Sequence, residues 1–460
     1  MSRTDGECRE DGHVTQTVFF ELPEPEETLE MSTPCERARP RLRRADRKQV
    51  AWRPVALDAL LPEDHPARVV WTYVDGLDLG PLHEPIAAVE GHAGRPAADP
   101  RILMSLWLYA TVDGVGSARQ LDRLCREHLA YLWICGGVSM NYHTLSDFRT
   151  AHVEFLDGLL TDSVAALLHQ GVVTLDRVAQ DGMRVRASAG TSSFRREGSL
   201  QRCLAEAEAR VGALREELEA DPGAASRRQE AARKRAARER LERVRKALEE
   251  LPKVGAARRA RNGPSKREPR ASTTDAEPRV MKMPGGGFRP AFNVQFATAT
   301  KSQIIVGAGV TNAGSDGGQL APMAEQIAKR YGRLPKEMLA DGDFAKLEDI
   351  DTLSAPPREV TVYAPVRETK NAKVAPHTPR PGDSEAVAAW RVRMGTPEAK
   401  EIYKERAATA ECVNADVRNH GLYRFLVRGL PKVCAVVLWH ALAHNFQRIV
   451  RLCPAMVGLG

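Results

Sequence analysis

From residue 177 onward, strand-like and helix-like segments follow one another in a set order, and this order constrains the fold more than any single motif does. Residues 177–186, in which apolar and polar side chains roughly alternate, predict the first strand. A long charged insert follows it. The remaining predicted elements are strands at residues 291–297 and 303–310, a helix at about 318–331, a strand that ends at Asp341, a further helix, a strand at 360–365 and a helix from about Pro397. This order predicts an α/β fold built on a mixed sheet.

Three acidic residues far apart in the chain each occupy a position typical of a metal-binding carboxylate. Asp181 lies within the first predicted strand. Asp341 ends a later strand and precedes Gly342, a residue that suits a chain leaving its sheet. Glu411 belongs to the last predicted helix, where it lies on nearly the same face as Arg418 at about 100° per residue. For any one of these acids taken alone, a solvated surface charge is the favoured interpretation. The combination of all three makes that interpretation less favoured.

Two strand carboxylates and a helical glutamate can hold a pair of Mg²⁺ ions, because hard divalent cations favour oxygen ligands and keep some water for substrate phosphates. Such a pair suits phosphodiester chemistry. One ion lowers the pKa of the attacking water or hydroxyl, and the other stabilises the leaving oxygen of an in-line displacement. No lysine or histidine base is then required.

Five segments around these acids resemble the DDE transposases of bacterial insertion sequences. They are residues 179–187, 271–282, 292–296, 340–345 and 403–411, and the similarity extends from about Arg47 to about Val450. In that family an RNase H-like domain carries the three acids, on neighbouring strands and the last helix. By resemblance, Asp181, Asp341 and Glu411 take the catalytic places and bind two Mg²⁺ or Mn²⁺ ions.

A Tyr, Arg, Glu, Lys signature marks the last helix of that family. Tyr403 and Arg406 fill the first two positions. Arg418 stands where the signature usually has lysine, which keeps the charge but changes its geometry. Asp343 replaces a residue that is often glycine. The resemblance therefore implies catalytic roles for Tyr403, Arg406 and Arg418 beside the three acids.

The resemblance implies a transposase that cuts DNA at the terminal inverted repeats of an insertion sequence and joins the ends to target DNA. Because two ends must be brought together, a homodimer or higher oligomer is expected. The expected location is the bacterial cytoplasm, in association with the nucleoid. Two alternatives stay open: a catalytically inactive DNA-binding protein derived from a transposase, and a metal-dependent nuclease that uses the same carboxylates.

Composition agrees with an anionic partner. The chain of 460 residues has a formal charge of +7 and a pI near 9.0, and its positive residues are clustered. Eight cysteines show no C-x-x-C spacing, which indicates neither a zinc ribbon nor a disulfide framework and fits a reducing cytoplasm. The N-terminus lacks the pattern of a signal peptide. The longest apolar stretch, residues 433–443, is too short to span a bilayer and predicts a buried core helix.

Four parts are expected along the chain. Residues 1–45 form an acidic and then basic tail, disordered in its acidic part. Residues 46–168 predict a helical N-terminal domain that binds DNA, and residues 169–195 with 271–450 predict the RNase H-like catalytic domain. Residues 196–270 predict a helical hairpin insertion with a basic loop.

The N-terminal domain has candidate DNA contacts at Arg119, Arg123 and Arg126. These residues lie on a short predicted helix after a turn at Gly116, an arrangement compatible with a helix-turn-helix. The alternative is that the arginines form the solvated face of a packed helix. In the transposase family this region is helical and is thought to recognise the ends of the element.

The insertion carries a coiled-coil-like pattern. Leucine and valine repeat at spacings of three, four and seven, which predicts two antiparallel helices usable for dimer contacts or for clamping DNA. A solvated charged hairpin without a partner is the alternative. Its exit, residues 253–270, predicts a flexible phosphate-binding loop with candidate DNA contacts at Arg258, Arg259, Arg261, Lys266 and Arg267.

Several other polar residues have two interpretations. Asp316, Asp343 and Glu401 are further candidate metal ligands, whereas Glu405 is expected to face solvent about 120° from Glu411 around the helix. Asn293 and Gln295 share a strand face, where they either form local hydrogen bonds or touch DNA. Three residues are expected to be structural: Asp275 in a turn, and His440 and His444 in the core or on the surface.

Overall fold

A computed structural model describes residues 54, 56–88, 96–220, 227–263, 268–367 and 375–457. Contacts divide the chain into Met1–Pro54 and Val55–Gly460, and the described helices and strands belong to the second unit. The predicted N-terminal tail, Lys266 and Arg267 lie outside the described residues.

The N-terminal region is helical, as its sequence predicts. In α3 (Pro100–Val112), the side chain of Asp99 accepts from the backbone N–H of Arg101 at 2.8 Å, and Pro100 occupies the first turn, where its missing N–H costs nothing. α3 is buried on almost every side, and most of its buried side chains are apolar. The other helices of the region are α1 (Pro66–Asp75), α2 (Gly80–His83), α4 (Ala118–Glu127), α5 (Leu129–Cys135), α6 (Tyr142–Ala151) and α7 (Val153–His169).

The predicted mixed sheet is present. Its strands are β1 (Arg177–Arg186), β4 (Arg279–Lys282), β5 (Phe288–Ala299), β6 (Ile305–Thr311), β7 (Glu337–Ala340) and β8 (Thr361–Tyr363), and a separate pair joins β2 (Phe194–Arg195) to β3 (Ala271–Ser272). The order is β4, β5, β1, β7, β8, with β6 also paired to β5. β1 is central: it runs antiparallel to β5 and parallel to β7. The bounds of β1 agree with the prediction, whereas β4 was not predicted from the sequence.

Helices cover the two faces of the sheet differently. α10 (Leu320–Tyr331) lies on the face that carries Gln180 and Gly182, since the side chain of Gln180 donates to the Gln319 carbonyl. The last helical segments lie on the opposite face, which carries Asp181, because adjacent residues of a strand point to opposite sides. The remaining helices are α11 (Leu347–Ser354), α12 (Glu385–Met394), α13 (Pro397–Arg406) and α14 (Cys412–Asn419).

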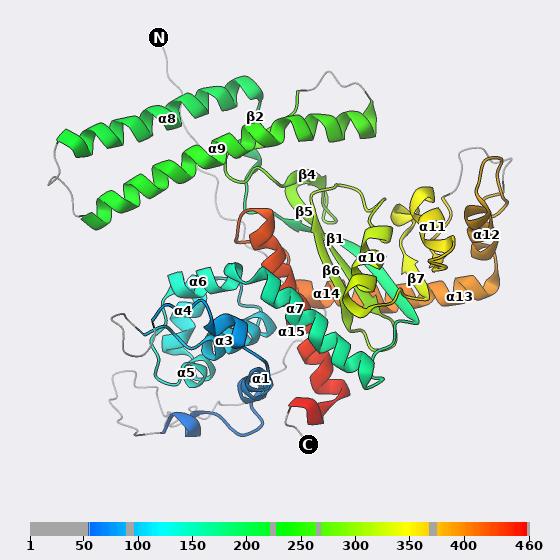
Figure 1. Cartoon of the computed structure of the whole chain (residues 1–460), viewed down its shortest axis with the longest axis horizontal. Coiled ribbons are helices and arrows are strands. Elements are labelled where there is room, and N and C mark those ends of the chain that lie inside the picture. The colour runs from blue at the N-terminus through cyan, green and yellow to red at the C-terminus, as the bar shows by residue number, and fades with distance from the viewer. Residues whose placement is uncertain are drawn as a thin grey trace, which may run out of the picture. The chain divides into compact units, whose positions relative to one another are not determined.

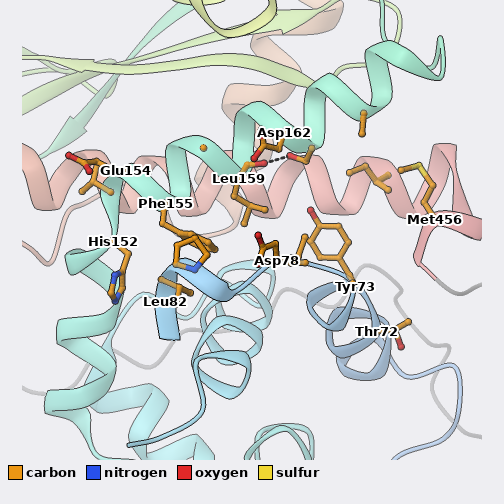
Figure 2. A pocket seen from close by; sticks show the side chains of 18 of the residues that line it. Thr72, Tyr73, Asp78, Leu82, His152, Glu154, Phe155, Leu159, Asp162 and Met456 are labelled. Carbon is orange, nitrogen blue, oxygen red and sulfur yellow. Dashed lines mark hydrogen bonds between the residues drawn. The ribbon is translucent and has the colours of Figure 1, made fainter. Parts of the chain in front are cut away.

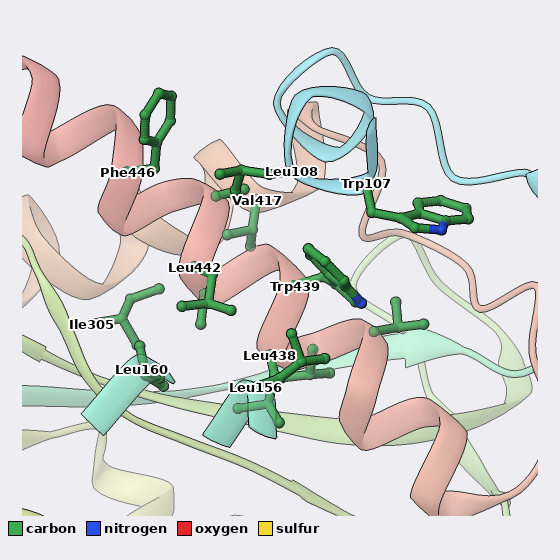
Figure 3. Packing of buried hydrophobic residues seen from close by; sticks show 14 of the residues in the cluster. Trp107, Leu108, Leu156, Leu160, Ile305, Val417, Leu438, Trp439, Leu442 and Phe446 are labelled. Carbon is green, nitrogen blue, oxygen red and sulfur yellow. The ribbon is translucent and has the colours of Figure 1, made fainter. Parts of the chain in front are cut away.

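One long helix joins the helical region to the sheet. α15 (Leu430–Leu452) contains the predicted buried core helix and packs against α3, α7 and β6. Its Trp439 and Leu442 lie in one cluster with Leu160 of α7 and Ile305 of β6 (Figure 3). The indole N–H of Trp439 donates to the Arg149 carbonyl at 3.0 Å. The helical region and the sheet therefore share one apolar core. Among the described residues, no helix is long and apolar enough to span a membrane.

The insertion consists of the expected pair of helices, α8 (Glu197–Ala220) and α9 (Arg227–Asn262), which lie side by side (Figure 1). Ion pairs from Arg233 to Glu217 and from Arg245 to Glu208 show that they run antiparallel. Among the described side chains of α8, Leu200, Ala207 and Leu214 are buried at a spacing of seven residues, whereas the seven-residue repeat predicted from the sequence, at Leu204 and Val211, is only partly buried.

One prediction for the insertion is wrong. Residues 253–262, expected in a flexible loop, continue α9 as a helix despite Pro252 within it. Alanine and arginine, which dominate this segment, are strong helix formers, and Leu251 packs into a small core with Ala247 and Ala271. Arg258, Arg259 and Arg261 therefore belong to a helix.

Candidate active site

Asp181 and Asp341 lie at the same level of two neighbouring strands. The last pair of the parallel β1–β7 ladder is Gln180 with Ala340, so the next residue along each strand is an aspartate. Asp341 directly follows β7 as the chain turns away at Gly342. The neighbouring strands that the family resemblance implies are thus present, and they bring two carboxylates to one edge of the sheet.

The guanidinium of Arg406 joins these two aspartates to Glu411. Its Nη2 atom lies 3.3 Å from Oδ1 of Asp181 and 3.9 Å from Oδ2 of Asp341. Its Nη1 atom lies 3.1 Å from Oε1 of Glu411. Arg406 is buried, with 10% of its side chain exposed, whereas the side chains of Asp341 and Glu411 are 52% and 59% exposed. The three predicted carboxylates thus converge on one arginine at a site that opens to solvent.

A π-helical turn makes this convergence possible. Arg406 and Glu411 are five residues apart, which in an α-helix of 3.6 residues per turn puts side chains roughly 140° apart. Between α13 and α14, however, residues Ala407–Glu411 form a π-helical turn, which widens the helix and brings such residues to one side. The continuous α-helix expected from about Pro397 to Arg418 is therefore wrong at this point.

Asn414 is a site residue that sequence reasoning missed. Its Nδ2 atom donates to Oδ2 of Asp181 at 3.0 Å, and its Oδ1 atom is buried without a hydrogen-bond partner. Asn414 follows Glu411 by three residues, a spacing that puts both on one helix face. That spacing was a usable signal in the sequence.

Burial and charge both act on the site. Burial raises the pKa of Asp181 above its ordinary value, the nearby Arg406 and the Gly182 N–H oppose this, and Asp341 adds to it. Burial alone would lower the pKa of Arg406, but the surrounding groups, led by Asp181, outweigh burial and raise it. Burial also raises the pKa of Tyr403, which lies one turn before Arg406. Asp181 therefore ionises less readily than an isolated aspartate.

Arg418 is not part of this cluster. Its side chain is exposed near the end of α14 and forms no ion pair among the residues that the structure describes. Glu405, expected to face solvent alone, instead pairs with Arg177, which also binds Glu337 at 2.5 Å. This pair fixes α13 against the start of β1 and β7.

The other candidate acids have different surroundings. Asp343 is exposed and pairs with Arg367 at 2.9 Å. Asp316 is buried and accepts hydrogen bonds from Asn293 at 2.6 Å and from Gln295 at 2.8 Å. Those two residues thus form local hydrogen bonds, the first of the two interpretations of their sequence pattern. Asp316 lies against Gly182, on the opposite face of β1 from Asp181.

Asp275, His440 and His444, which were expected to be structural, all have partners or surroundings within the fold. Asp275 is buried in a turn and accepts from the backbone N–H of Gly429. His440 is buried in the core, where burial lowers its pKa to about 3. His444 bridges Oδ2 of Asp416 and the carbonyl of Gln303.

Four of the predicted DNA contacts have local partners, whereas Arg259 on α9 is exposed and forms no ion pair with a described acid. On α4, Arg126 pairs with Asp122 and Arg123 with Glu127, each one turn away, while Arg119 lies over the ring of Tyr142. On α9, Arg258 donates to the carbonyl of Glu268 at 3.4 Å. Arg123 and Arg126 fit the solvated face of a packed helix as well as they fit a DNA contact.

The cluster suits a hard divalent cation in its donor chemistry. Carboxylates from Asp181, Asp341 and Glu411 supply oxygen ligands, and the unpartnered Oδ1 of Asn414 is a further oxygen donor. Within the described part of the chain, no three His, Cys, Asp or Glu side chains are close enough together to hold an ion. The guanidinium of Arg406 lies between the carboxylates and supplies the positive charge that such an ion would bring.

A separate cavity of about 970 Å³ lies among α1, α7 and α15 (Figure 2). Tyr73, Phe155 and Leu159 supply apolar walls, and Asp78 and Asp162 supply acids. None of the converging carboxylates lines this cavity. Its acids would repel phosphates, so it is a poor candidate for a nucleic-acid site.

Comparison with known proteins gives two matches. Residues 55–151 match a family model described as Transposase domain (DUF772), and residues 367–450 match one described as Transposase DDE domain. The first covers most of the N-terminal helices. The second covers α12 to α14 and most of α15, including Arg406, Glu411 and Asn414. No curated protein and no solved structure matches the chain.

Proposed function

Because the chain belongs to the DDE transposases of insertion sequences, we propose that it hydrolyses DNA at the ends of such an element and joins the freed ends to target DNA. The observation that carries this proposal is the convergence of Asp181, Asp341 and Glu411 on Arg406. Double-stranded DNA with terminal inverted repeats is the substrate, and a homodimer or higher oligomer holds both ends. The protein works in the bacterial cytoplasm on nucleoid DNA.

The reaction has two steps that exchange one phosphorus–oxygen bond each. Water attacks the phosphorus at the element end, the bond to the 3′ oxygen breaks, and a free 3′-hydroxyl remains. That hydroxyl then attacks a target phosphodiester, forms a new phosphorus–oxygen bond and releases a target 3′-hydroxyl. When bound by Asp181, Asp341 and Glu411, two Mg²⁺ or Mn²⁺ ions would lower the pKa of the attacking oxygen and stabilise the leaving one.

The chain's own residues orient the site for these steps. Asn414 donates to Oδ2 of Asp181, while Oδ1 accepts from the backbone N–H of Gly182 and faces Arg406, so the carboxylate is held in one orientation. Arg406 neutralises the carboxylates before DNA arrives and can then contact the substrate phosphate, for which its planar donors are suited. Tyr403 and Arg418 are assigned to positioning the flanking strand.

The test is cleavage and strand transfer with Mg²⁺ and DNA that carries the inverted repeats flanking the gene. Asp181→Asn, Asp341→Asn and Glu411→Gln should each abolish both reactions and leave DNA binding largely intact. Asp343→Asn and Glu401→Gln are matched controls, because these carboxylates are exposed and pair with Arg367 and Lys404. An Asp341→Asn protein that cuts at a comparable rate would overturn the assignment. Cleavage without strand transfer would indicate a nuclease, and DNA binding without cleavage an inactive derivative.

A further inference from the structure

One edge of β1 is unpaired beside the converging carboxylates. On the β7 side, strand pairing stops at Gln180 with Ala340, and main-chain pairing resumes at Arg186, which bridges to Arg424. Within the part of the chain that the structure describes, residues 181–185 have no strand partner on that side. Asp341 thus marks one end of this open edge, and the loop between α14 and α15 marks the other.

That loop is held firmly in place. The backbone N–H of Arg186 donates to the Tyr423 carbonyl at 3.3 Å, and the backbone N–H of Phe425 donates to the Arg186 carbonyl at 2.8 Å. The ring of Phe425 is buried and packs edge-on against Phe292, with 5.9 Å between ring centroids. The side chains that this loop exposes are therefore presented by a fixed backbone.

The loop exposes an unusual mixture of side chains. Tyr423 is 67% exposed and Leu426 is 54% exposed. Around them lie the exposed arginines Arg186, Arg424 and Arg428, none of which forms an ion pair with a described acid. Residues 417–429 contain no aspartate or glutamate. We call these five residues, Arg186, Tyr423, Arg424, Leu426 and Arg428, the Tyr423 surface.

We propose that the Tyr423 surface binds the DNA strand that continues from the carboxylate site. This inference rests on the proposed function. Unpaired arginines attract phosphates, and an exposed aromatic ring offers a base or sugar a contact that does not depend on sequence. A second copy of the chain fits less well, because the centres of protein interfaces are depleted in charged residues and three unpaired arginines would face their equivalents.

The spacing along β1 agrees with a continuous strand of DNA. Asp181 and Arg186 are five residues apart, roughly 17 Å along a β-strand. DNA advances about 3.4 Å per nucleotide. A strand whose scissile phosphate lies at Asp181 therefore reaches the Tyr423 surface about five nucleotides away.

The experiment measures binding of the full chain to inverted-repeat DNA over a range of salt concentrations. Arg424→Ala combined with Arg428→Ala should reduce the slope of log affinity against log salt by about two, since each phosphate contact contributes roughly 0.9. A 5-iododeoxyuridine placed about five nucleotides from the cleavage site should cross-link to Tyr423. Tyr423→Ala should abolish this cross-link, and Tyr423→Phe should keep it.

Two matched controls occupy exposed positions elsewhere. Arg333→Ala removes an exposed arginine before β7, and Val392→Ala removes an apolar side chain that is 52% exposed on α12. Neither should change the salt slope. If wild type cuts DNA but the double variant keeps its salt slope, the inference is overturned and the proposed function stands. An altered oligomeric state with an unchanged slope assigns the surface to a second copy. If wild type neither binds nor cuts this DNA, the proposed function fails, and the inference fails with it.

Discussion

The side-chain amide of Gln303 donates a hydrogen bond of 3.0 Å to the carbonyl oxygen of Ala408, inside the π-helical turn that precedes Glu411. Gln303 has a positive φ of 58°, which non-glycine residues rarely adopt. Its own carbonyl accepts from Nε2 of His444, whose Nδ1 contacts Asp416 on α14. The turn between β5 and β6 is therefore tied to the π-helical turn, to α14 and to α15, and we expect Gln303 to help position Glu411.

Gln303→Ala should lower the turnover number for DNA cleavage by roughly tenfold, because a small displacement of a metal-binding side chain costs rate. DNA affinity should change less than about twofold, since the expected effect passes through the carbonyl of Ala408. Gln303→Asn keeps a residue that tolerates positive φ but shortens the amide. It should therefore lose rate as the alanine variant does and keep more thermal stability. Equal losses in turnover and in folded fraction would mean that the residue acts only on stability.

Asp181 should limit stability at neutral pH. Its folded pKa is raised, mainly by burial, so its contribution to stability is full below the ordinary value of 3.8 and is lost as pH rises through the raised pKa. Asp181→Asn resembles the protonated form. This variant should raise the melting temperature by about 1–3 °C at pH 8, and the gain should shrink as pH falls toward 3.8. Calorimetry of both proteins across this range, without divalent cations, makes the comparison. A constant difference between them at every pH would contradict the account.

Much of the site was predictable from local pattern. Alternation gave the bounds of β1, and Asp341 was found because a short apolar strand runs into Gly342. The alternation in β1 and the strand that runs into Gly342 can each be recognised from a few consecutive residues. The pairing of β1 with β7 is a long-range contact, and it was expected only by resemblance.

The π-helical turn could not have been predicted in the same way. No residue type in Ala407–Glu411 requires a wider turn, and the hydrogen bond that supports it comes from Gln303, about a hundred positions earlier in the chain. Arg406 was identified as a signature residue, but its contacts with all three carboxylates depend on that turn. The loop predicted at residues 253–262 is wrong for a different reason: the clustered basic charge that favoured a loop is also compatible with a helix, and the alanines and arginines there are strong helix formers.

Gly182 should not tolerate a side chain. A Cβ atom built there would lie 2.1 Å from Oδ1 of Asp316, which Asn293 and Gln295 hold in place. Gly182→Ala should therefore destabilise the fold by about 1–3 kcal/mol through overpacking next to Asp181. Gly158→Ala on α7 is the control, because a Cβ there meets no atom within 4 Å. The control should be neutral or slightly stabilising, since alanine favours helix. Similar melting temperatures for the two variants would contradict the predicted clash.

Arg406 should take the place of a cation when no divalent ion is bound. Its guanidinium contacts all three carboxylates, and Arg406→Ala leaves them to repel one another. We expect Arg406→Ala to lower the free energy of unfolding by about 3 kcal/mol. This is the lower end of the range for breaking a buried ion pair, because Asp341 and Glu411 are partly exposed and screened by solvent. Arg406→Lys should recover only part of it, since an ammonium cannot bridge three groups as a planar guanidinium does.

The measurement is the melting temperature as a function of Mg²⁺ concentration. An ion that binds the folded protein stabilises it, and its relief of carboxylate repulsion is greater when the arginine is absent. The rise in melting temperature at saturating Mg²⁺ should therefore be larger in Arg406→Ala than in wild type. Arg177→Ala removes an arginine that also bridges two glutamates but lies outside the cluster, so it should lose stability without any change in its Mg²⁺ response. An identical Mg²⁺ response in Arg406→Ala and wild type would show that Arg406 does not occupy the place of the ion.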